Sequence, residues 1–195
     1  RARRYAGLFM GEDPEAPNWD AERRLLRSPH VGSMGPAWRN FDKYYTHYRY
    51  EQWKPWPLPY LDLAGIASVE DLKDPANERR MGEAIVRRMA RGDVVANLAS
   101  TTMATHAYLL TGDEQCRRWV REYTEAWIER AARNGGVVPD NVGLSGQVGE
   151  YLQGKWYGGY YGWSWPHGWH TIGDAVLAAA ENLALLYQDP GWIDF

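Results

Sequence analysis

Residues 106–127 read HAYLLTGDEQCRRWVREYTEAW, and this stretch decides the fold class. The TGD sequence at 111–113 is typical of a tight turn, and apolar residues recur after it at spacings of four, three and four: Cys116, Val120, Tyr123 and Trp127. This repeat matches the 3.6-residue period of an amphipathic helix. Asn134, Gly135 and Gly136 end the helix, because Asn and Gly readily adopt the left-handed conformation of a C-cap. The stretch therefore predicts two helices joined by a tight turn.

Helices are also predicted on both sides of this hairpin. Asp74 and Pro75 begin one of them, since Asp is a favoured N-cap and Pro fits the first turn. Residues 93–110 are predicted to form a single helix, which Asp93 caps and whose many small side chains let neighbouring helices approach closely. Thr171 and Asp174 resemble a capping box and predict the start of a further helix, rich in Ala and Leu. Buried helices that alternate with amphipathic ones indicate inner and outer layers, so the predicted fold class is mainly α.

Residues 1–74 are predicted to be an irregular, aromatic-rich arm. Pro and Gly interrupt much of this region, yet eight aromatic residues fall within twenty positions: Phe41, Tyr44, Tyr45, Tyr48, Tyr50, Trp53, Trp56 and Tyr60. A disordered segment has the opposite composition. We therefore expect the arm to pack on the helical region, residues 75–195, within one structural domain.

Charge and composition exclude several classes of function. The chain has 22 Lys and Arg against 25 Asp and Glu and a pI near 6.0, so it lacks the basic surface expected for nucleic-acid binding. No apolar run approaches the roughly 18 residues of a membrane-spanning helix. We therefore expect no nucleic-acid or membrane partner. No nucleotide motif or metal-site spacing occurs either, so we expect no cofactor and no metal. Five arginines of the helix after Pro75 are expected to face water: Arg79, Arg80, Arg87, Arg88 and Arg91.

Residues 156–169 read WYGGYYGWSWPHGW, and seven of these fourteen residues are Trp or Tyr. Flat aromatic faces with polar edges suit stacking on sugar rings, while Gly lets the backbone approach a ligand closely. We therefore predict a poly- or oligosaccharide ligand. The aromatic residues predicted to bind it come from this loop and from the arm: Trp156, Tyr161, Trp163, Trp165, Trp169, Trp53 and Trp56.

The helical hairpin, followed by NGGVVPDNVG at 134–143 and KWYGGYYGW at 155–163, resembles the (α/α)-toroid carbohydrate-active enzymes. These include the six-hairpin glycosidases and the toroid polysaccharide lyases, and the likeness covers about residues 74–188. It implies an incomplete toroid of helical hairpins, whose long aromatic-rich loops line a glycan cleft. It also implies that the chain works with the rest of a longer chain or as a homo-oligomer, and it favours a secreted or periplasmic location.

The resemblance implies cleavage of a uronate polymer by β-elimination. Toroid lyases are similar to one another in using Asn, His and Tyr to neutralise the uronate carboxylate, remove the neighbouring proton and protonate the leaving oxygen. Residues of these types in and near the loop are Asn141, His167, His170, Tyr157, Tyr160 and Tyr161. Histidine suits the role of base because its unperturbed pKa of about 6.5 lies near neutrality.

Hydrolysis is the alternative reaction, and it needs two carboxyl groups roughly 5 to 9.5 Å apart across the glycosidic bond. The candidate carboxylates are Asp140, Glu150 and Asp174. Asp140 lies in a Pro-Asp-Asn turn and Asp174 in the predicted capping box, so a structural role is favoured for both. β-Elimination is therefore slightly preferred to hydrolysis.

Two non-catalytic roles remain as alternatives. The same aromatic residues suit a non-catalytic glycan-binding module, which has no turnover to lose when His167 or Tyr160 is mutated. Alternatively, the Trp/Tyr loop is a structural plug in the helical domain or the contact with another chain. Full burial of its Trp side chains would favour the plug.

Overall fold

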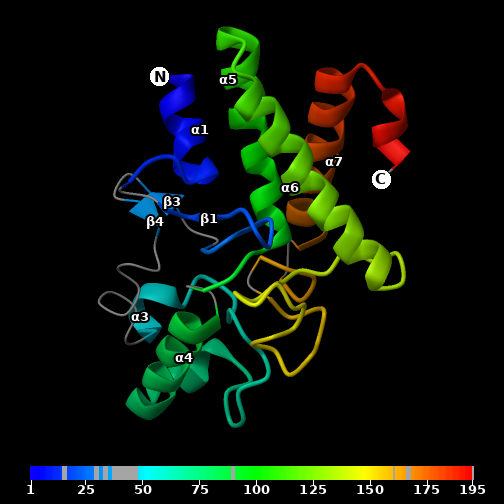
Figure 1. Cartoon of the computed structure of the whole chain (residues 1–195). Helices are drawn as coiled ribbons and strands as arrows, with labels where there is room; N and C mark the ends of the chain where they lie inside the picture. Colours follow the sequence, from blue (N-terminus) through cyan, green and yellow to red (C-terminus); the bar gives the residue numbers. More distant parts are fainter. Residues whose placement is uncertain are drawn as a thin grey trace.

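The computed structural model is mainly helical, as the sequence predicts, and its helices fall into two groups that each enclose an apolar core (Figure 1). The structure describes residues 1–14, 17–28, 31–32, 35–36, 48–88, 91–159, 161–165 and 168–194. No helix in these ranges is long and apolar enough to cross a lipid bilayer.

The larger core is built by four helices in the upper half of Figure 1. They are α1 (Ala2–Met10), α5 (Thr101–Thr111), α6 (Glu114–Arg133) and α7 (Gly168–Tyr187), and the 3-10 helix η3 (Val95–Ser100) packs against α7. We call their shared apolar cluster the helical core; its fully buried members include Leu98, Ala107, Cys116, Val120, Tyr123, Trp127, Ala179 and Leu183. All four residues of the predicted α6 stripe belong to it, which confirms the amphipathic helix.

The ends of α6 also follow the sequence prediction. Asp113 Oδ1 accepts a hydrogen bond from Gln115 N at 3.0 Å and caps the helix. Gly112 before it has φ 72°, and Gly135 and Gly136 after the helix have φ 72° and 85°. Glycine adopts these left-handed conformations without the steric penalty that a Cβ brings. Both turns are therefore determined locally.

Residues 93–110 do not form the single helix predicted for them. η3 occupies the first part, and α5 begins only at Thr101. Ser100 Oγ donates to Asn97 O and Thr101 Oγ1 donates to Leu98 O, each at 2.6 Å. These bonds to carbonyls three residues earlier compete with the α-helical pattern, so the small polar residues delay the start of α5.

The start of α7 also differs from the prediction. The helix begins at Gly168, so Thr171 and Asp174 lie inside it and the predicted capping box is wrong. A Cβ on Gly168 would lie 2.0 Å from Gly162 O. The preceding loop therefore lies so close to the first residue of α7 that only glycine fits there.

The second, smaller core lies in the lower half of Figure 1. Its elements are α3 (Tyr50–Trp53), the 3-10 helix η2 (Val69–Lys73) and α4 (Pro75–Arg88). We call their shared apolar cluster the arm core; its buried members are Tyr48, Leu58, Tyr60, Ile66, Leu72, Met81, Ala84, Ile85 and Leu152. Leu152 comes from the loop between α6 and α7, whereas Val142 of the same loop belongs to the helical core. This loop therefore contacts both cores.

The first 74 residues contain more regular structure than the predicted irregular arm. α1 packs against α5 and buries Ala6 and Met10. Two short antiparallel hairpins follow: β1 (Trp19–Asp20) with β2 (Leu25–Leu26), and β3 (Val31–Gly32) with β4 (Gly35–Pro36). A capping box between Ser68 and Asp71 begins η2. At the other end of the chain, the 3-10 helix η4 (Pro190–Asp194) follows α7.

Candidate functional site

A cavity of about 270 Å³ lies between the arm and the loop that joins α6 to α7. We call it the arm–loop cavity; it is lined by Leu58, Pro59, Leu61, Asp62, Leu152, Lys155, Tyr157, Gly158, Ser164 and Trp165. Small-molecule sites usually enclose about 300–1,000 Å³. The volume of this cavity lies just below that range, which suits one sugar residue and excludes a long segment of polymer.

Two aromatic side chains of the loop line the arm–loop cavity. Tyr157 is 45% exposed, and its ring lies edge-on to Trp156 with 5.1 Å between centroids. Trp165 is partly buried and lies edge-on to Tyr161 with 5.5 Å between centroids. Tyr161 has φ 58°, a left-handed conformation that is unusual for an aromatic residue. The backbone therefore turns sharply between the segments that carry the two cavity aromatics.

The charged groups that line the cavity are Asp62 and Lys155. Arg88 donates from Nη1 and Nη2 to the two carboxylate oxygens of Asp62, at 2.6 and 3.1 Å. Burial acts to raise the pKa of Asp62, but the hydrogen bonds and charge of Arg88 outweigh it, and the pKa is lowered. Lys155 forms no ion pair with any residue that the structure describes. Among the described residues, the cavity therefore combines a carboxylate paired with Arg88 and an ammonium group without a close ion pair.

Arg88 was predicted to face water, but it lies beside the arm core. Its side chain is 7% exposed, and its guanidinium carbon lies 4.8 Å from the centre of the Tyr60 ring. Met81, Ile85 and Arg88 are spaced four and three residues apart, which places them on one face of α4. The guanidinium therefore emerges from the apolar face of the helix and meets Asp62 there.

Asp140 holds the aromatic loop in place. It is fully buried, and its carboxylate accepts hydrogen bonds from Gly158 N, Gly159 N and Asn141 Nδ2 at 2.9 Å and from Trp163 N at 2.8 Å. Burial raises its pKa, although these donors act in the opposite direction. The carboxylate does not line the arm–loop cavity. We therefore regard Asp140 as a positioning residue and not as a catalytic carboxylate.

Two glycines allow the loop to wrap around this carboxylate. A Cβ on Gly162 would lie 2.1 Å from Asp140 Oδ2, and a Cβ on Gly159 would lie 2.8 Å from Asp140 Oδ1. A side chain at either position would displace the carboxylate. These glycines therefore serve the folding of the loop, whereas the sequence suggested close approach to a ligand.

The side-chain amide of Asn141 is also used inside the loop. Its Nδ2 donates to Asp140 Oδ1 at 2.9 Å and to Lys155 O at 3.2 Å, and its Oδ1 accepts from Gly149 N at 3.0 Å. An amide nitrogen carries only two donors. Asn141 therefore has no donor left for a substrate carboxylate, and the neutralising role predicted for it does not fit this geometry.

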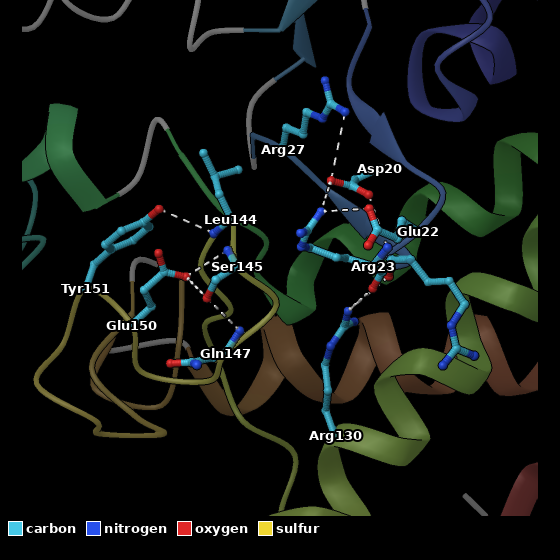
Figure 2. Close-up of polar contacts among 11 residues, drawn as sticks. Asp20, Glu22, Arg23, Arg27, Arg130, Leu144, Ser145, Gln147, Glu150 and Tyr151 are labelled. Atoms are coloured by element: carbon cyan, nitrogen blue, oxygen red, sulfur yellow. Dashed lines mark hydrogen bonds and ion pairs between the residues drawn. The ribbon is translucent and has the colours of Figure 1, made fainter.

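Glu150 lies in a compact turn of the same loop (Figure 2). Its Oε2 accepts from Ser145 N at 2.9 Å and from Ser145 Oγ at 2.6 Å. Asp174 is exposed on α7. None of the three candidate carboxylates, Asp140, Glu150 and Asp174, lines the arm–loop cavity. The structure therefore does not bring them together in the way that a hydrolytic pair requires.

Most of the other predicted stacking residues lie outside the cavity. Trp163 and Trp169 form a tilted pair with 6.3 Å between centroids, and Trp169 is 71% exposed. Trp53 stacks on Tyr48 in the arm core with 4.6 Å between centroids. Trp56 is 56% exposed and does not line the cavity. Of the predicted stacking residues, Trp165 alone lines the cavity, together with Tyr157 from the catalytic candidates.

Only one of the two predicted catalytic histidines, His170, lies within the described residues, and it does not contribute to the site. His170 is exposed in the first turn of α7 and does not line the cavity. His167 and Tyr160 lie outside the described residues, so their roles stay predictions. Within the described residues there is no group of three or more His, Cys, Asp and Glu that could hold a metal ion.

Sequence reasoning missed a second buried carboxylate, Asp93, which was considered only as a helix cap. It is 1% exposed and accepts four hydrogen bonds, from Leu26 N at 3.0 Å, Val94 N at 2.9 Å, Asn97 Nδ2 at 2.8 Å and Tyr123 OH at 2.9 Å. Burial raises its pKa to about 6, against the charge of Arg130 and the donors. Its backbone pairs with Val142 of the loop. Asp93 thus joins the arm, the helices and the loop.

Asp62 and Lys155 were missed as well. The only signals for them were weak: Lys155 directly precedes the Trp/Tyr loop, and Asp62 follows the aromatic run of the arm. Neither pattern indicates that the two side chains line one cavity. Their positions depend on how the arm and the loop meet.

These features define a small, mainly α domain whose cavity is lined by an aromatic-rich loop. The whole chain, residues 1–195, matches the model of a family described as a domain of unknown function, DUF8034, and the chain belongs to this family. Comparisons with curated proteins and with solved structures find no match. Function therefore has to be argued from the cavity and its residues.

Proposed function

We propose that this chain binds a poly- or oligosaccharide and holds one sugar residue in the arm–loop cavity. The observation that carries the proposal is the combination of aromatic and polar groups in one cavity: Tyr157, Trp165, Asp62, Lys155 and Ser164. A sugar ring has apolar faces and a rim of hydroxyl groups. Its site therefore needs stacking surfaces and a few polar groups, as these residues provide.

The charges of the cavity favour an acidic sugar. Arg88 holds both carboxylate oxygens of Asp62, whereas Lys155 acts on Asp62 only through its charge and forms no close ion pair with any described residue. A uronate carboxylate would pair with Lys155, because a charge-assisted hydrogen bond is stronger than a neutral one. The sugar hydroxyls would donate to the lone pairs of Asp62 that Arg88 leaves free.

The exposure of the aromatic loop supports a binding surface and speaks against a structural plug. A plug would bury its indoles, but Trp156, Trp163 and Trp165 are only partly buried and Trp169 is 71% exposed. Tyr157 is 45% exposed as well. We further propose that α5, α6 and α7 are part of an (α/α) toroid, completed by further helices of a longer chain or by another copy.

β-Elimination is the reaction that the cavity supports best. Tyr157 presents a phenol that can protonate the leaving oxygen, and Lys155 can neutralise the uronate carboxylate from the same cavity. His167 is the base implied by the resemblance to toroid lyases. Hydrolysis has less support, because Asp62 is the only carboxylate of the described residues that lines the cavity, and it is paired with Arg88.

Binding is tested by titrating the protein with uronate and neutral oligosaccharides, while calorimetry records the heat of binding and fluorescence records the change in tryptophan emission. Tyr157→Ala and Trp165→Ala are each expected to weaken uronate binding about tenfold, from roughly 1.4 kcal/mol of lost stacking. Trp56→Ala removes an exposed indole of the arm outside the cavity and serves as the matched control with unchanged affinity. Equal losses in the control and the cavity variants, or no binding by wild type, would contradict the proposal.

Cleavage is tested on the same saccharides by recording the ultraviolet absorbance of unsaturated uronates together with reducing ends. Tyr157→Phe keeps the ring and removes the hydroxyl, so we expect binding to persist and turnover to be lost. Reducing ends without the absorbance would contradict β-elimination and favour hydrolysis. Binding with neither signal would identify a non-catalytic glycan-binding module.

A further inference from the structure

A second, much smaller cavity of about 20 Å³ lies where the arm core meets the helical core. Its polar lining residues are Tyr60, Arg88, Asp93, Asn141 and Tyr151. One water molecule needs about 10–15 Å³ of probe-occupied volume and two to four polar partners. The cavity therefore fits a single water molecule and is too small for an organic ligand.

Arg88, which lines this cavity, carries a buried donor without a partner among the described residues. Its two Nη atoms are used by Asp62, and its side chain is only 7% exposed. The Nε–H group is buried and has no hydrogen-bond partner among the residues that the structure describes. A buried donor that loses its hydration and gains no acceptor is costly, so such groups are nearly always paired with protein or with ordered water.

Asp93 also lines this cavity, and its carboxylate has acceptor capacity left. Its Oδ1 accepts from Val94 N, Asn97 Nδ2 and Tyr123 OH, whereas its Oδ2 accepts, among the described residues, only from Leu26 N, at 3.0 Å. An ionised carboxylate oxygen has two lone-pair directions. Oδ2 can therefore accept one further hydrogen bond.

We propose that one structural water molecule occupies this cavity, accepts a hydrogen bond from Arg88 Nε and donates one to Asp93 Oδ2. The water connects the Asp62–Arg88 pair, which reaches the arm–loop cavity, to the buried carboxylate beside the helical core. It also fixes the plane of the guanidinium group. The orientation of the Asp62 carboxylate in the arm–loop cavity then depends on a contact on the far side of Arg88.

A high-resolution crystal structure of the wild-type chain tests this proposal directly. We expect an ordered water roughly 2.7–3.2 Å from both Arg88 Nε and Asp93 Oδ2. Absence of ordered density in the cavity would overturn the proposal. So would a protein oxygen that accepts the Nε–H bond in place of water.

Arg88→Lys provides the second test, because lysine keeps a positive charge for Asp62 but has no equivalent of the Nε–H group. We expect the water density to weaken or disappear and the melting temperature to fall by several degrees. Arg87→Lys, an exposed position on the same helix, is the matched control and should change neither. A water that keeps full occupancy in R88K would overturn the proposal. If R88K does not fold, the wild-type structure decides the question by itself.

Discussion

The helical core and the arm core are held together by different means. In the helical core, the apolar stripe of α6 and the cap at Asp113 set the positions of residues through helix geometry. In the arm core, short segments are tied by polar contacts: Glu78 accepts from Tyr48 N at its backbone oxygen and from Tyr50 N at its carboxylate. The arm–loop cavity borders the second region. Residues suited to chemistry therefore gather where polar contacts, and not helix periodicity, decide the structure.

The two buried carboxylates show the same contrast. The donors to Asp93 come from β2, from α6 and from the segment around η3, so this carboxylate joins separate parts of the chain. The donors to Asp140 all come from its own loop, between Asn141 and Trp163. Loss of Asp93 should therefore weaken the whole domain, whereas loss of Asp140 should disturb one loop.

The largest effect is expected from a truncation in the helical core. Trp127 is fully buried on α6, so Trp127→Ala should lower the free energy of unfolding by about 3–5 kcal/mol. Urea unfolding followed by far-ultraviolet circular dichroism measures this loss. Trp169→Ala, at an exposed position of α7, is the control and should cost under about 0.5 kcal/mol. Similar costs for the two variants would mean that the helical core is not the main source of stability.

A smaller effect is expected from the titration of Asp93. Burial raises its pKa from 3.8 to about 6, so the folded chain binds this proton more tightly than the unfolded chain. Its contribution to stability is therefore fully present below the unfolded pKa and is lost as the pH rises through about 6. At 1.36 kcal/mol per pKa unit, the loss is about 3 kcal/mol.

Asp93→Asn isolates this titration because the amide carries no proton to lose. We expect the free energy of unfolding of wild type, relative to D93N, to decrease as the pH rises from about 4 to 6. Carboxylates whose pKa is lowered, such as Asp62 and Asp113, titrate in both proteins and cancel in the difference. A difference that does not vary with pH would show that Asp93 is ionised throughout.

The part of the fold that could be predicted is the part that depends on neighbours in sequence. The α6 stripe and its glycine turns need only local geometry, and they were predicted correctly. Arg88 was assigned to solvent from its charge, although its spacing from Met81 and Ile85 already placed it on the apolar face. Here a general tendency of charged residues was preferred to the periodicity, and the periodicity was right.

The candidate site was less predictable because its contacts connect distant segments. Asp93 was predicted to be a cap, but its burial depends on Leu26, which lies 67 residues earlier. Asp140 was recognised as a turn residue, yet Trp163, one of its donors, lies 23 residues later. Neither partner can be derived from turn chemistry. The cap role predicted for Asp93 is wrong, because Val94 is the N-cap residue of η3. Both carboxylates bind distant segments, and these networks could not be predicted from local sequence.

Removal of the Asp140 carboxylate is expected to have a moderate and local effect. Asp140→Ala should cost about 1–3 kcal/mol of stability, because it leaves the backbone donors of Gly158, Gly159 and Trp163 without their acceptor. The larger consequence should be a displaced loop, seen in near-ultraviolet circular dichroism and in lost saccharide binding. Asp174→Ala, exposed on α7, is the control for both measurements. Unchanged near-ultraviolet spectra in D140A would contradict the positioning role.

The arm segment at Arg23 and Arg24 is attached to α6 in two ways. Arg130 is 6% exposed, and its Nη2 donates to the backbone oxygen of Arg23 at 3.0 Å (Figure 2). The same atom donates to the backbone oxygen of Arg24, also at 3.0 Å. Arg24 Nη2 also pairs with Glu129 Oε2 at 2.6 Å, in a partly exposed position. The first contact is buried and directed at the backbone, whereas water and salt reach the second.

The smallest effect is therefore expected from Glu129→Gln, which removes the charge of the exposed pair and keeps the shape of the side chain. Exposed ion pairs contribute about 0.2–1 kcal/mol and are screened by salt. The loss in free energy of unfolding should lie in this range at low ionic strength and vanish at high ionic strength. Urea unfolding of both proteins at the two ionic strengths measures it. A loss greater than that of D140A, or one that persists in high salt, would mean that the arm depends on its exposed charges. The buried contacts of Arg130 and Asp93 would then be secondary, and the contrast between the two regions would be reversed.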